Sequence, residues 1–341
     1  MKDIKSMTLK EITEDFLKIG EKKYRANQVY DWIVKGVSSF DEMTNLPKSL
    51  REKLNEIYSI ISLKIENKKV SVDSTVKYLF KLYDGEFIES VVMKYNHGYT
   101  ICVSTQAGCK MGCAFCKTGK LGFSRNLLTS EMVSQIQAAE RDLNIKISNV
   151  VLMGMGEPLD NYDNVVKFLK MISSEDHMCI GMRHISLSTC GIVDKIYRLA
   201  DENFQLTLSV SLHAPNDEIR KNLMKIARRW NVNELMDACR YYIRKTGRRI
   251  SFEYTMISGV NDSIKCAGEL ASILKGTLCH VNLIPLNGED ENLKRSSKEN
   301  IYKFKNFLEK NHINATIRRT LGEDIEGACG QLKASHIPKE V

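Results

Sequence analysis

The sequence predicts an α/β protein whose main part is a partial (β/α)6 barrel, preceded by a helical domain and a β-hairpin. Short apolar runs alternate with longer segments of helical spacing, which is typical of parallel strands with helices packed on the sheet. Six such runs are too few to close an eight-stranded barrel, so we expect an open one. The runs are TICVST, NVVLMGM, HISLST, LTLSVSL, ISFEYTMI and HVNLIPL.

Residues 1–68 are predicted to form a helical accessory domain. Thr8 and Glu11 make a T-x-x-E capping box, and Ser39 and Glu42 repeat this pattern. The segment YRANQVYDWIVKG then places its apolar residues on one helical face. This part of the sequence contains no catalytic pattern, so we expect it to serve docking or substrate recognition.

Residues 69–97 predict a β-hairpin extension. The β-rich runs TVKYLFKL and EFIESVVMKY flank an Asp84-Gly85 pair, which is a strong hairpin signal. The barrel domain is expected at residues 98–335, and a C-terminal tail at residues 336–341. The sequence has no internal repeat and no low-complexity tract.

The composition is that of a soluble globular protein, with 43% hydrophobic and 27% charged residues in a chain of 341. Neither a run of roughly 18 apolar residues nor a secretory signal occurs. We therefore expect a cytoplasmic monomer without membrane association, whose ten cysteines do not form a disulfide framework. Five scattered cysteines are expected to pack as small buried hydrophobes. They are Cys179, Cys190, Cys239, Cys266 and Cys279.

The net charge of +8 is concentrated in residues 221–249, where nine bases stand against two acids. Trp230, Tyr241 and Tyr242 lie among these bases. Bases beside aromatic rings are what a phosphate backbone and unstacked RNA bases attract. A solvated helix face would show the same charges, so the pattern suggests nucleic acid without establishing it.

Three cysteines, Cys109, Cys113 and Cys116, lie within the single segment CKMGCAFCKTG. A structural zinc site is closed by four ligands, usually in two separated pairs. Cys179 is available as a fourth ligand, but nothing beside it has ligand spacing. A [4Fe-4S] cluster held by three thiolates leaves one iron open to an exogenous ligand. The spacing therefore favours one such cluster over zinc.

This segment, with Phe115 before its last cysteine, resembles the radical S-adenosylmethionine (SAM) superfamily, and the predicted barrel is the partial barrel of that superfamily. The resemblance implies that SAM binds the open iron and is cleaved by electron transfer to a 5′-deoxyadenosyl radical. GMGEP resembles the second motif of the superfamily, in which glycines let the backbone approach the ligand. Glu157 would accept hydrogen bonds from the amino group of SAM.

Further segments resemble the RlmN/Cfr family of RNA adenine methyltransferases, and its RlmN branch most. They are YRANQVYDWIVKG, SFDEMTNLPKSLREKL, IESVVM, CVSTQAGCKMGCAFCKTG, GFSRNL, MGMGEPLDNYDNV, SVSLHAP, FEYTMISGVNDS, HVNLIPLN and ACGQL. The resemblance implies that Cys329 accepts a methyl group from one SAM, and that a second SAM yields the radical that abstracts hydrogen from it. The methylene then adds to carbon 2 of adenine, Glu89 accepts the ring proton, and Cys102 attacks the sulfur of Cys329. Product release leaves a transient disulfide.

The resemblance also assigns SAM contacts to residues at the carboxyl ends of the predicted strands, where one site is expected. These residues are Gly156, Glu157, Ser188, Ser211, Leu212, His213 and Asn287. The implied substrates are the adenine at the peptidyl-transferase centre of 23S rRNA and the adenine beside the anticodon of tRNA. An electron donor of the flavodoxin or ferredoxin type is implied as a partner.

Two alternatives stay open. A Cfr-like enzyme that methylates carbon 8 of the rRNA adenine and confers antibiotic resistance would share the cysteines and Glu89. An iron–sulfur RNA-binding protein without catalytic activity would share only the cluster ligands, since binding alone requires neither Cys102 nor Cys329.

Overall fold

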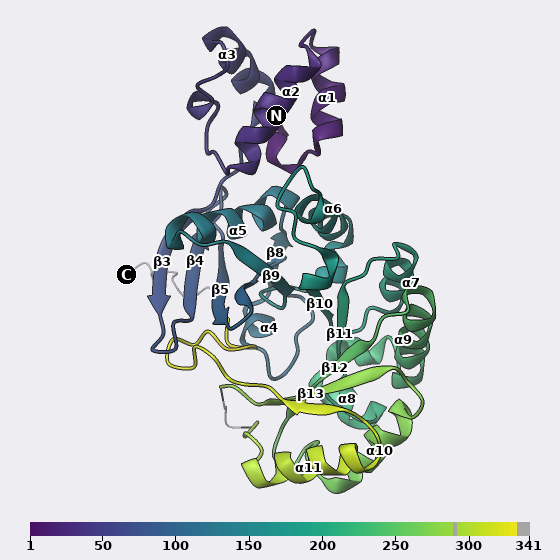
Figure 1. Cartoon of the computed structure of the whole chain (residues 1–341). Helices are drawn as coiled ribbons and strands as arrows, with labels where there is room; N and C mark the ends of the chain where they lie inside the picture. Colours follow the sequence, from purple (N-terminus) through teal and green to yellow (C-terminus); the bar gives the residue numbers. More distant parts are fainter. Residues whose placement is uncertain (289–291, 333–341) are drawn as a thin grey trace.

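One mixed sheet of ten strands, in the order β14-β13-β12-β11-β10-β9-β6-β5-β4-β3, organises the chain (Figure 1). The structure is a computed structural model, which describes residues 1–288 and 292–332. Parallel pairing runs without interruption from β6 to β14. These strands are β6 (Gly98–Cys102), β9 (Ile147–Leu152), β10 (Ile185–Thr189), β11 (Thr207–Ser211), β12 (Ile250–Met256), β13 (Cys279–Pro285) and β14 (Ala315–Ile317).

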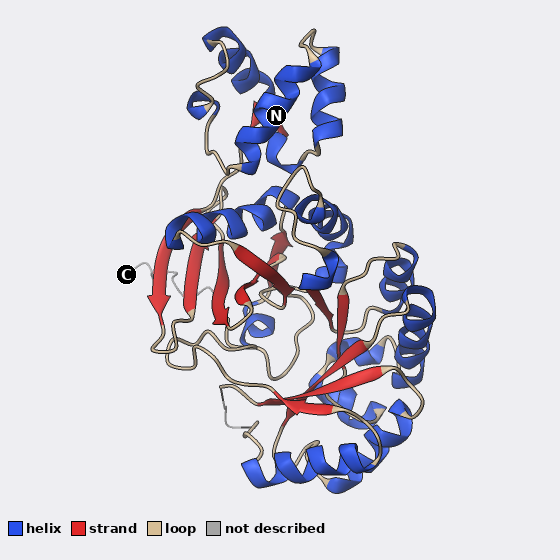
Figure 2. Ribbon diagram, in the orientation of Figure 1, coloured by secondary structure: helices blue, strands red, loops and turns tan. Residues whose placement is uncertain are grey.

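The parallel strands confirm the predicted open barrel, because the two ends of the sheet do not pair with each other. Helices connect the strands and lie on the outer side of the curved sheet, as Figure 2 shows. They are α5 (Thr129–Leu143), α6 (Tyr162–Ser173), α7 (Val193–Asp201), α8 (Asp217–Leu223), α9 (Val232–Thr246), α10 (Ile264–Leu274) and α11 (Lys298–Lys310). Strand β14 was not predicted, because its three residues are too few to show a pattern.

The antiparallel strands β3 (Lys64–Val70), β4 (Val76–Lys81) and β5 (Phe87–Tyr95) extend the sheet beyond β6. The hairpin predicted at Asp84-Gly85 is present, and Gly85 has the positive φ of 91° that such a turn needs. Residues 64–68 were expected to belong to a helical domain but form the start of β3. This edge strand is rich in exposed lysines, which discourage pairing with another chain.

Three N-terminal helices pack around an apolar cluster of their own. They are α1 (Leu9–Lys18), α2 (Lys23–Val34) and α3 (Lys48–Ile57). Both predicted capping boxes are present, although the one at Ser39 and Glu42 opens a 3-10 turn instead of an α-helix. The short strands β1 (Lys2–Asp3) and β2 (Tyr58–Ser59) pair and bring the two ends of this segment together. In the described part of the chain, no helix is long and apolar enough to cross a membrane.

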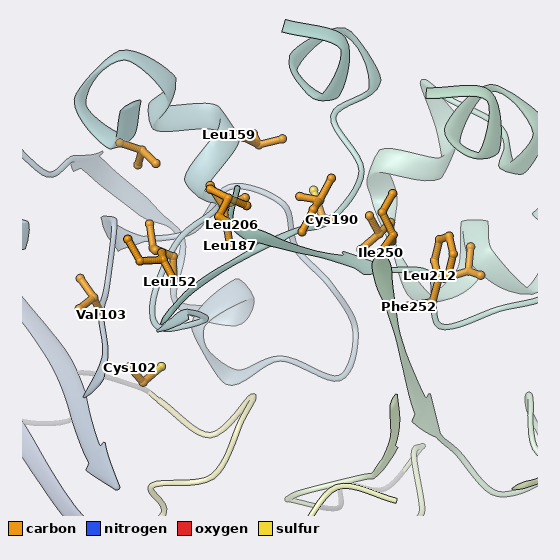
Figure 3. Close-up of a cluster of buried hydrophobic side chains, with 14 of the residues drawn as sticks. Cys102, Val103, Leu152, Leu159, Leu187, Cys190, Leu206, Leu212, Ile250 and Phe252 are labelled. Carbon is orange, nitrogen blue, oxygen red and sulfur yellow. The ribbon is translucent and has the colours of Figure 1, made fainter. Parts of the chain in front are cut away.

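The barrel core lies between the sheet and the outer helices, and Figure 3 shows a part of it around Leu187 and Phe252. Among the scattered cysteines, the prediction of burial holds for three: Cys190, Cys239 and Cys266. Cys279 is half-buried. Cys179 is exposed on the loop after α6, where its backbone has a φ of 56°, so the prediction of burial is wrong for this residue.

Candidate active site

A cavity of about 1000 Å³ of empty space, partly open to solvent, lies at the carboxyl ends of the parallel strands. Most residues that the sequence predicted for the site line it, and they come from segments far apart in the chain. They are Cys109, Cys113, Cys116, Gly156, Glu157, Ser188, Ser211, His213, Asn287 and Cys329. Three predicted residues, Glu89, Cys102 and Leu212, are not in its lining. The structure thus brings the predicted cluster ligands, the predicted SAM contacts and Cys329 together.

The loop with the three clustered cysteines runs between β7 (Gln106–Gly108) and α4 (Lys117–Leu121). Its start is fixed because the amide of Cys109 donates to the carbonyl oxygen of Gly122 at 2.7 Å. Gly108 has a φ of 78°, and a Cβ at this position would collide with the same oxygen. Further along, the amide of Ala114 donates to the carbonyl oxygen of Leu223 in α8. The loop is therefore anchored on both sides of its second cysteine.

The chemistry of this loop fits an iron–sulfur cluster. Within the described residues, no three His, Cys, Asp or Glu side chains are grouped closely enough to hold one metal ion. The thiolates of a [4Fe-4S] cluster bind different irons, so they need not converge on one point. Burial raises the pKa of Cys109 to about 12 and also raises the pKa of Cys116, and the positive charge of a bound metal would oppose this penalty on the thiolate form.

A buried arginine adds to this fit. Arg220 is fully buried, and its Nη1 has no hydrogen-bond partner among the described residues. Burial raises the pKa of Cys113, and the positive charge of Arg220 partly opposes this shift. An anionic, thiolate-bound cluster beside this cation would satisfy a charge that the protein alone leaves partly unpaired.

The GMGEP segment forms a tight turn after β9. Gly156 has a φ of 100°, and a Cβ there would lie 2.5 Å from Cβ of Gln106. The Glu157 carboxylate is buried and accepts hydrogen bonds from two backbone amides, those of Leu159 at 3.0 Å and Cys190 at 2.7 Å. Burial raises the pKa of Glu157, and these hydrogen bonds oppose the shift. The turn thus presents a rigid carboxylate at the cavity wall.

The ends of β10 and β11 carry Ser188 and Ser211, and Arg220 holds these two strand ends together. Its guanidinium donates to the carbonyl oxygens of Cys190 at 2.7 Å, Ser211 at 3.2 Å and Leu212 at 3.2 Å. The side chain of Leu212 is fully buried in the core, so only the backbone of Leu212 can face a ligand. Sequence reasoning missed Arg220, which adjoins the basic segment but points inward.

His213 is held as a neutral imidazole. Its backbone has a φ of 55°, and its Nδ1 accepts a hydrogen bond from the amide of Thr255 at 2.9 Å, so the ring hydrogen is on Nε2. Burial lowers the pKa of His213 to about 3, and the charge of Arg220 adds to this effect. The ring of Phe115 contacts it edge-on at a centroid distance of 4.6 Å. These contacts give the cavity a fixed hydrogen-bond donor.

A second cavity, of about 560 Å³ of empty space, adjoins the first and contains Cys102. Cys329 lines both cavities, as do Asn287 and Arg318. The side-chain amide of Asn287 donates to the carbonyl oxygen of Cys329 at 3.2 Å. Burial raises the pKa of Cys102 to about 12; the neighbouring Cys329 adds to this effect and Arg318 opposes it. Figure 3 shows Cys102 beside the C-terminal segment.

Glu89 lies on β5, on the face of the sheet that carries Cys102, since Val91 pairs with Cys102 and is two residues from Glu89. Its carboxylate is buried and lies 3.4 Å from Nζ of Lys77, which sequence reasoning did not single out. Glu253, another buried acid, lines the first cavity and lies 3.8 Å from Arg318. In the sequence, Lys77 and Glu253 are each a charged residue within an otherwise apolar strand, and this pattern could have identified them as candidate site residues.

The basic segment 221–249 is only partly a surface feature. Tyr242 lies on the inner face of α9 and is fully buried in the core. It is therefore not available to stack on an RNA base. Another part of the segment forms an open groove beside the cysteine loop. This groove is lined by Lys110, Met111, Lys225, Ile226, Arg228 and Arg229. The bases nearest to the site are thus those of the 3-10 turn Lys225–Arg228 and its neighbours.

Comparisons with known proteins agree with this geometry. Residues 103–265 match the radical SAM superfamily, and residues 2–60 match the N-terminal domain of ribosomal RNA large subunit methyltransferases. A probable dual-specificity RNA methyltransferase RlmN of Alkaliphilus oremlandii is 53% identical over 98% of both chains. A protein with the same description from Clostridium novyi is 54% identical over 99% of both. The crystal structure of a radical SAM methyltransferase from Sphaerobacter thermophilus superposes with a TM-score of 0.93 at 44% identity, covering 98% of this chain and 100% of that one. The chain belongs to the RlmN family of dual-specificity RNA methyltransferases, within the radical SAM superfamily.

Proposed function

We propose that this protein methylates carbon 2 of adenine in RNA, at the peptidyl-transferase centre of 23S rRNA and beside the anticodon of tRNA. The observation that carries the proposal is the position of Cys329, which lines both the cavity of the three clustered cysteines and the cavity of Cys102. One cysteine is thereby shared by the cavity of the predicted cofactor ligands and the cavity of a second thiol.

In this proposal Cys109, Cys113 and Cys116 would hold one [4Fe-4S] cluster, and the other lining residues of the first cavity would bind SAM. The cofactors supply the methyl group and the one-electron hydrogen abstraction that a non-nucleophilic aromatic carbon requires, with two SAM consumed per turnover. Glu157 would accept a hydrogen bond from the amino group of SAM, and His213, which lines the same cavity, would offer its Nε2–H. Ser188, Ser211 and Asn287 offer further polar groups, and Gly156 shapes the wall. Leu212, which is not in the lining, would take part only through its backbone, between Ser211 and His213.

The protein residues that act on the methyl group are Cys329, Glu89 and Cys102. Cys329 carries the carbon as an S-methyl group and becomes bonded through it to adenine. Glu89 accepts the ring proton. Cys102 then attacks the sulfur of Cys329 and the sulfur–carbon bond breaks. The carbon keeps the electron pair and takes up a proton to become the methyl group, and the two cysteines form a disulfide that must be reduced before the next cycle. The cavity shared by Cys102 and Cys329 supports this step.

The remaining parts are assigned to substrate handling. Residues 1–63 would form an RNA-docking domain, residues 64–97 the hairpin extension with its edge strand β3, and residues 98–335 the catalytic domain. The tail predicted at residues 336–341, like residues 333–335, lies outside the described residues.

The groove of Lys225, Arg228 and Arg229 would contact phosphates. We place the enzyme in the cytoplasm as a monomer that receives electrons from a flavodoxin- or ferredoxin-type protein.

The test is mass spectrometry of rRNA and tRNA nucleosides from cells that express the protein, compared with cells that express the Cys329→Ala variant. We expect 2-methyladenosine that depends on Cys329. A predominance of 8-methyladenosine would overturn the assignment of carbon 2 in favour of the Cfr-like alternative. Anaerobic reaction of the reconstituted enzyme with SAM, reductant and RNA completes the test. If neither 5′-deoxyadenosine nor methylated RNA forms, the protein is not the proposed enzyme.

A further inference from the structure

Lys77 is a buried lysine that connects the Glu89 carboxylate to the chain segment carrying Cys329. Its side chain is 5% exposed, and its Nζ lies 3.4 Å from Oε1 of Glu89. The same Nζ donates to the carbonyl oxygen of Glu326 at 3.2 Å. A lysine is almost never buried unless its charge is paired. Its burial therefore depends on partners from two segments that are far apart in the sequence.

The pairing of the strands places Lys77 on the face that carries the proposed chemistry. Glu89 on β5 lies opposite Leu79 on β4, and Val91 lies opposite Lys77, so Lys77 and Glu89 are diagonal neighbours on one face. Val91 also lies opposite Cys102 on β6. Because alternate residues of a strand share a face, Lys77, Glu89 and Cys102 all point to the same side of the sheet.

At the other end of the contact, Glu326 is held from two sides. Its backbone has a φ of 53°, a conformation that is costly for a residue other than glycine and persists only when its surroundings impose it. Lys77 holds its carbonyl oxygen, and Nζ of Lys117 binds its carboxylate at 2.8 Å. Lys117 directly follows the cluster ligand Cys116, and Glu326 precedes Cys329 by three residues.

We propose that Lys77 is a positioning residue that holds the Glu89 carboxylate and the Cys329 segment in one arrangement, so that the proton acceptor and the methyl carrier meet the same adenine. This inference rests on the proposed function. Without the ammonium group, the Glu326 carbonyl loses a partner on β4, and the segment can move independently of β5. A lysine that merely stabilised the fold would not affect how tightly hydrogen abstraction is coupled to RNA methylation.

The first experiment measures hydrogen exchange of the backbone amides in Lys77→Met, Lys77→Arg and a matched control, Lys81→Met. Lys81 lies on the same strand and the same face but is exposed. We expect peptides from residues 322–332 to exchange at least about tenfold faster in Lys77→Met, and at wild-type rates in the control. Lys77→Arg keeps the cation, so we expect an intermediate rate. Unchanged exchange in Lys77→Met would overturn the proposal.

The second experiment counts 5′-deoxyadenosine against methylated adenine in a single turnover with RNA. We expect Lys77→Met to form S-methylcysteine and 5′-deoxyadenosine as the wild type does, with at least about tenfold less methylated RNA, and Lys77→Arg to restore part of the yield. An unchanged ratio would refute the positioning role, whatever the exchange rates. If Lys77→Met does not fold, the double variant Lys77→Met/Glu89→Gln removes the buried negative charge together with the lysine that faces it. The exchange of this double variant then decides whether Lys77 holds the segment.

The two experiments separate this inference from the proposed function. If the wild-type enzyme methylates no RNA, the proposed function fails and, with it, the positioning role in that reaction. The exchange of residues 322–332 then still shows whether Lys77 fixes the segment. If the wild type methylates RNA and both Lys77→Met readouts equal those of the control, only the role of Lys77 is refuted.

Discussion

The backbone amide of Lys117 donates a 2.9 Å hydrogen bond to the carbonyl oxygen of Gly330, so the residue after Cys116 is bonded to the residue after Cys329. A second bond runs in parallel, from the hydroxyl of Thr118 to the carbonyl oxygen of Leu332 at 2.6 Å. Two segments more than 200 residues apart in sequence thereby form one wall of the first cavity. A substitution that loosens the Cys329 segment should therefore also loosen the loop of the three clustered cysteines, and the reverse should hold.

Replacing Thr118 with valine tests this link. The variant keeps the side-chain shape but leaves the buried carbonyl of Leu332 without the hydroxyl, which we expect to lower the free energy of unfolding by about 1–3 kcal/mol. Urea denaturation measures the change. Thr316→Val is the control, because the Thr316 hydroxyl also makes a hydrogen bond, to Nε2 of His280 at 2.8 Å, but at an exposed site where water replaces the lost partner. We expect this loss to alter the free energy of unfolding by less than about 0.5 kcal/mol. Equal effects of the two substitutions would contradict a specific role for the Thr118 bond.

The cysteine pair should separate two stages of the reaction. Cys329→Ala removes the carrier of the methyl group, so we expect no methylated RNA. Cys102→Ala removes the thiol that releases the product, so we expect RNA to remain covalently attached to the protein, visible as a shifted band on a denaturing gel. Cys179→Ala, at an exposed position, should behave as the wild type. Free methylated RNA at normal yield from Cys102→Ala would rule out its resolving role.

The parts of the fold that could be predicted from the sequence are those with local signals. The parallel strands show apolar runs, and Asp84-Gly85 marks the hairpin, because these patterns depend only on nearby residues. Strand β14 has no such pattern, and β3 reads as polar because it lies exposed at the sheet edge. Both segments become strands because they pair with distant parts of the chain, and the local sequence does not reveal this pairing.

The candidate site divides in the same way. The cluster ligands share one short segment, so their spacing was sufficient to predict them. The proximity of Cys102 to Cys329 was predicted only by family resemblance, because 227 positions separate the two in the sequence. Arg220 and Lys77 were missed because each is a base whose burial results from partners on distant segments. Charge in a sequence reveals the residue type but not the direction in which the side chain points.

Gly156 should tolerate no side chain. Gly156→Ala would place a Cβ 2.5 Å from Cβ of Gln106, in addition to the strain of a φ of 100°. We expect loss of SAM binding by at least about tenfold in isothermal titration of the reconstituted protein. Gly259→Ala is the matched control, since Gly259 also has a positive φ, of 70°, but has no atom within 4 Å of an added Cβ. Similar loss in both variants would show that strain alone, not close packing at the turn, is responsible.

The groove beside the cysteine loop should contribute to RNA affinity through charge. We expect Arg228→Gln to weaken the binding of rRNA fragments of different sequences by about the same factor. We also expect it to reduce the slope of log affinity against log salt concentration by about 0.7–1. Fluorescence anisotropy at several salt concentrations gives both quantities. Lys303→Gln on α11, which removes a base paired with Glu299, serves as the control. An unchanged salt slope in Arg228→Gln would show that the groove does not bind phosphate.

His177 should make the fold sensitive to acid. It follows α6, is 8% exposed, and packs edge-on against Tyr30 of α2 at a centroid distance of 5.9 Å. Neither ring nitrogen has a hydrogen-bond partner among the described residues. Burial lowers the pKa of His177 to about 4, and the nearby charges of Lys5 and Lys146 add to the shift. The folded protein therefore keeps this ring neutral where the unfolded chain would protonate it.

The direction of the effect follows from proton uptake. The unfolded chain binds a proton at this histidine below a pH of about 6.5, whereas the folded protein does so only near pH 4. The contribution of His177 to the free energy of unfolding is thus fully present above pH 6.5. As the pH is lowered from 6.5 to 4, this contribution falls by about 1.4 kcal/mol per pH unit. His177→Leu removes this contribution, so urea unfolding at pH 7.5 and 5.0 should show a smaller difference than in the wild type. His213, whose pKa is also lowered, acts in the same direction and leaves a residual slope. His97→Leu, at an exposed site, should keep the wild-type difference, and an equal difference in His177→Leu would mean that His177 is not the acid-sensitive group.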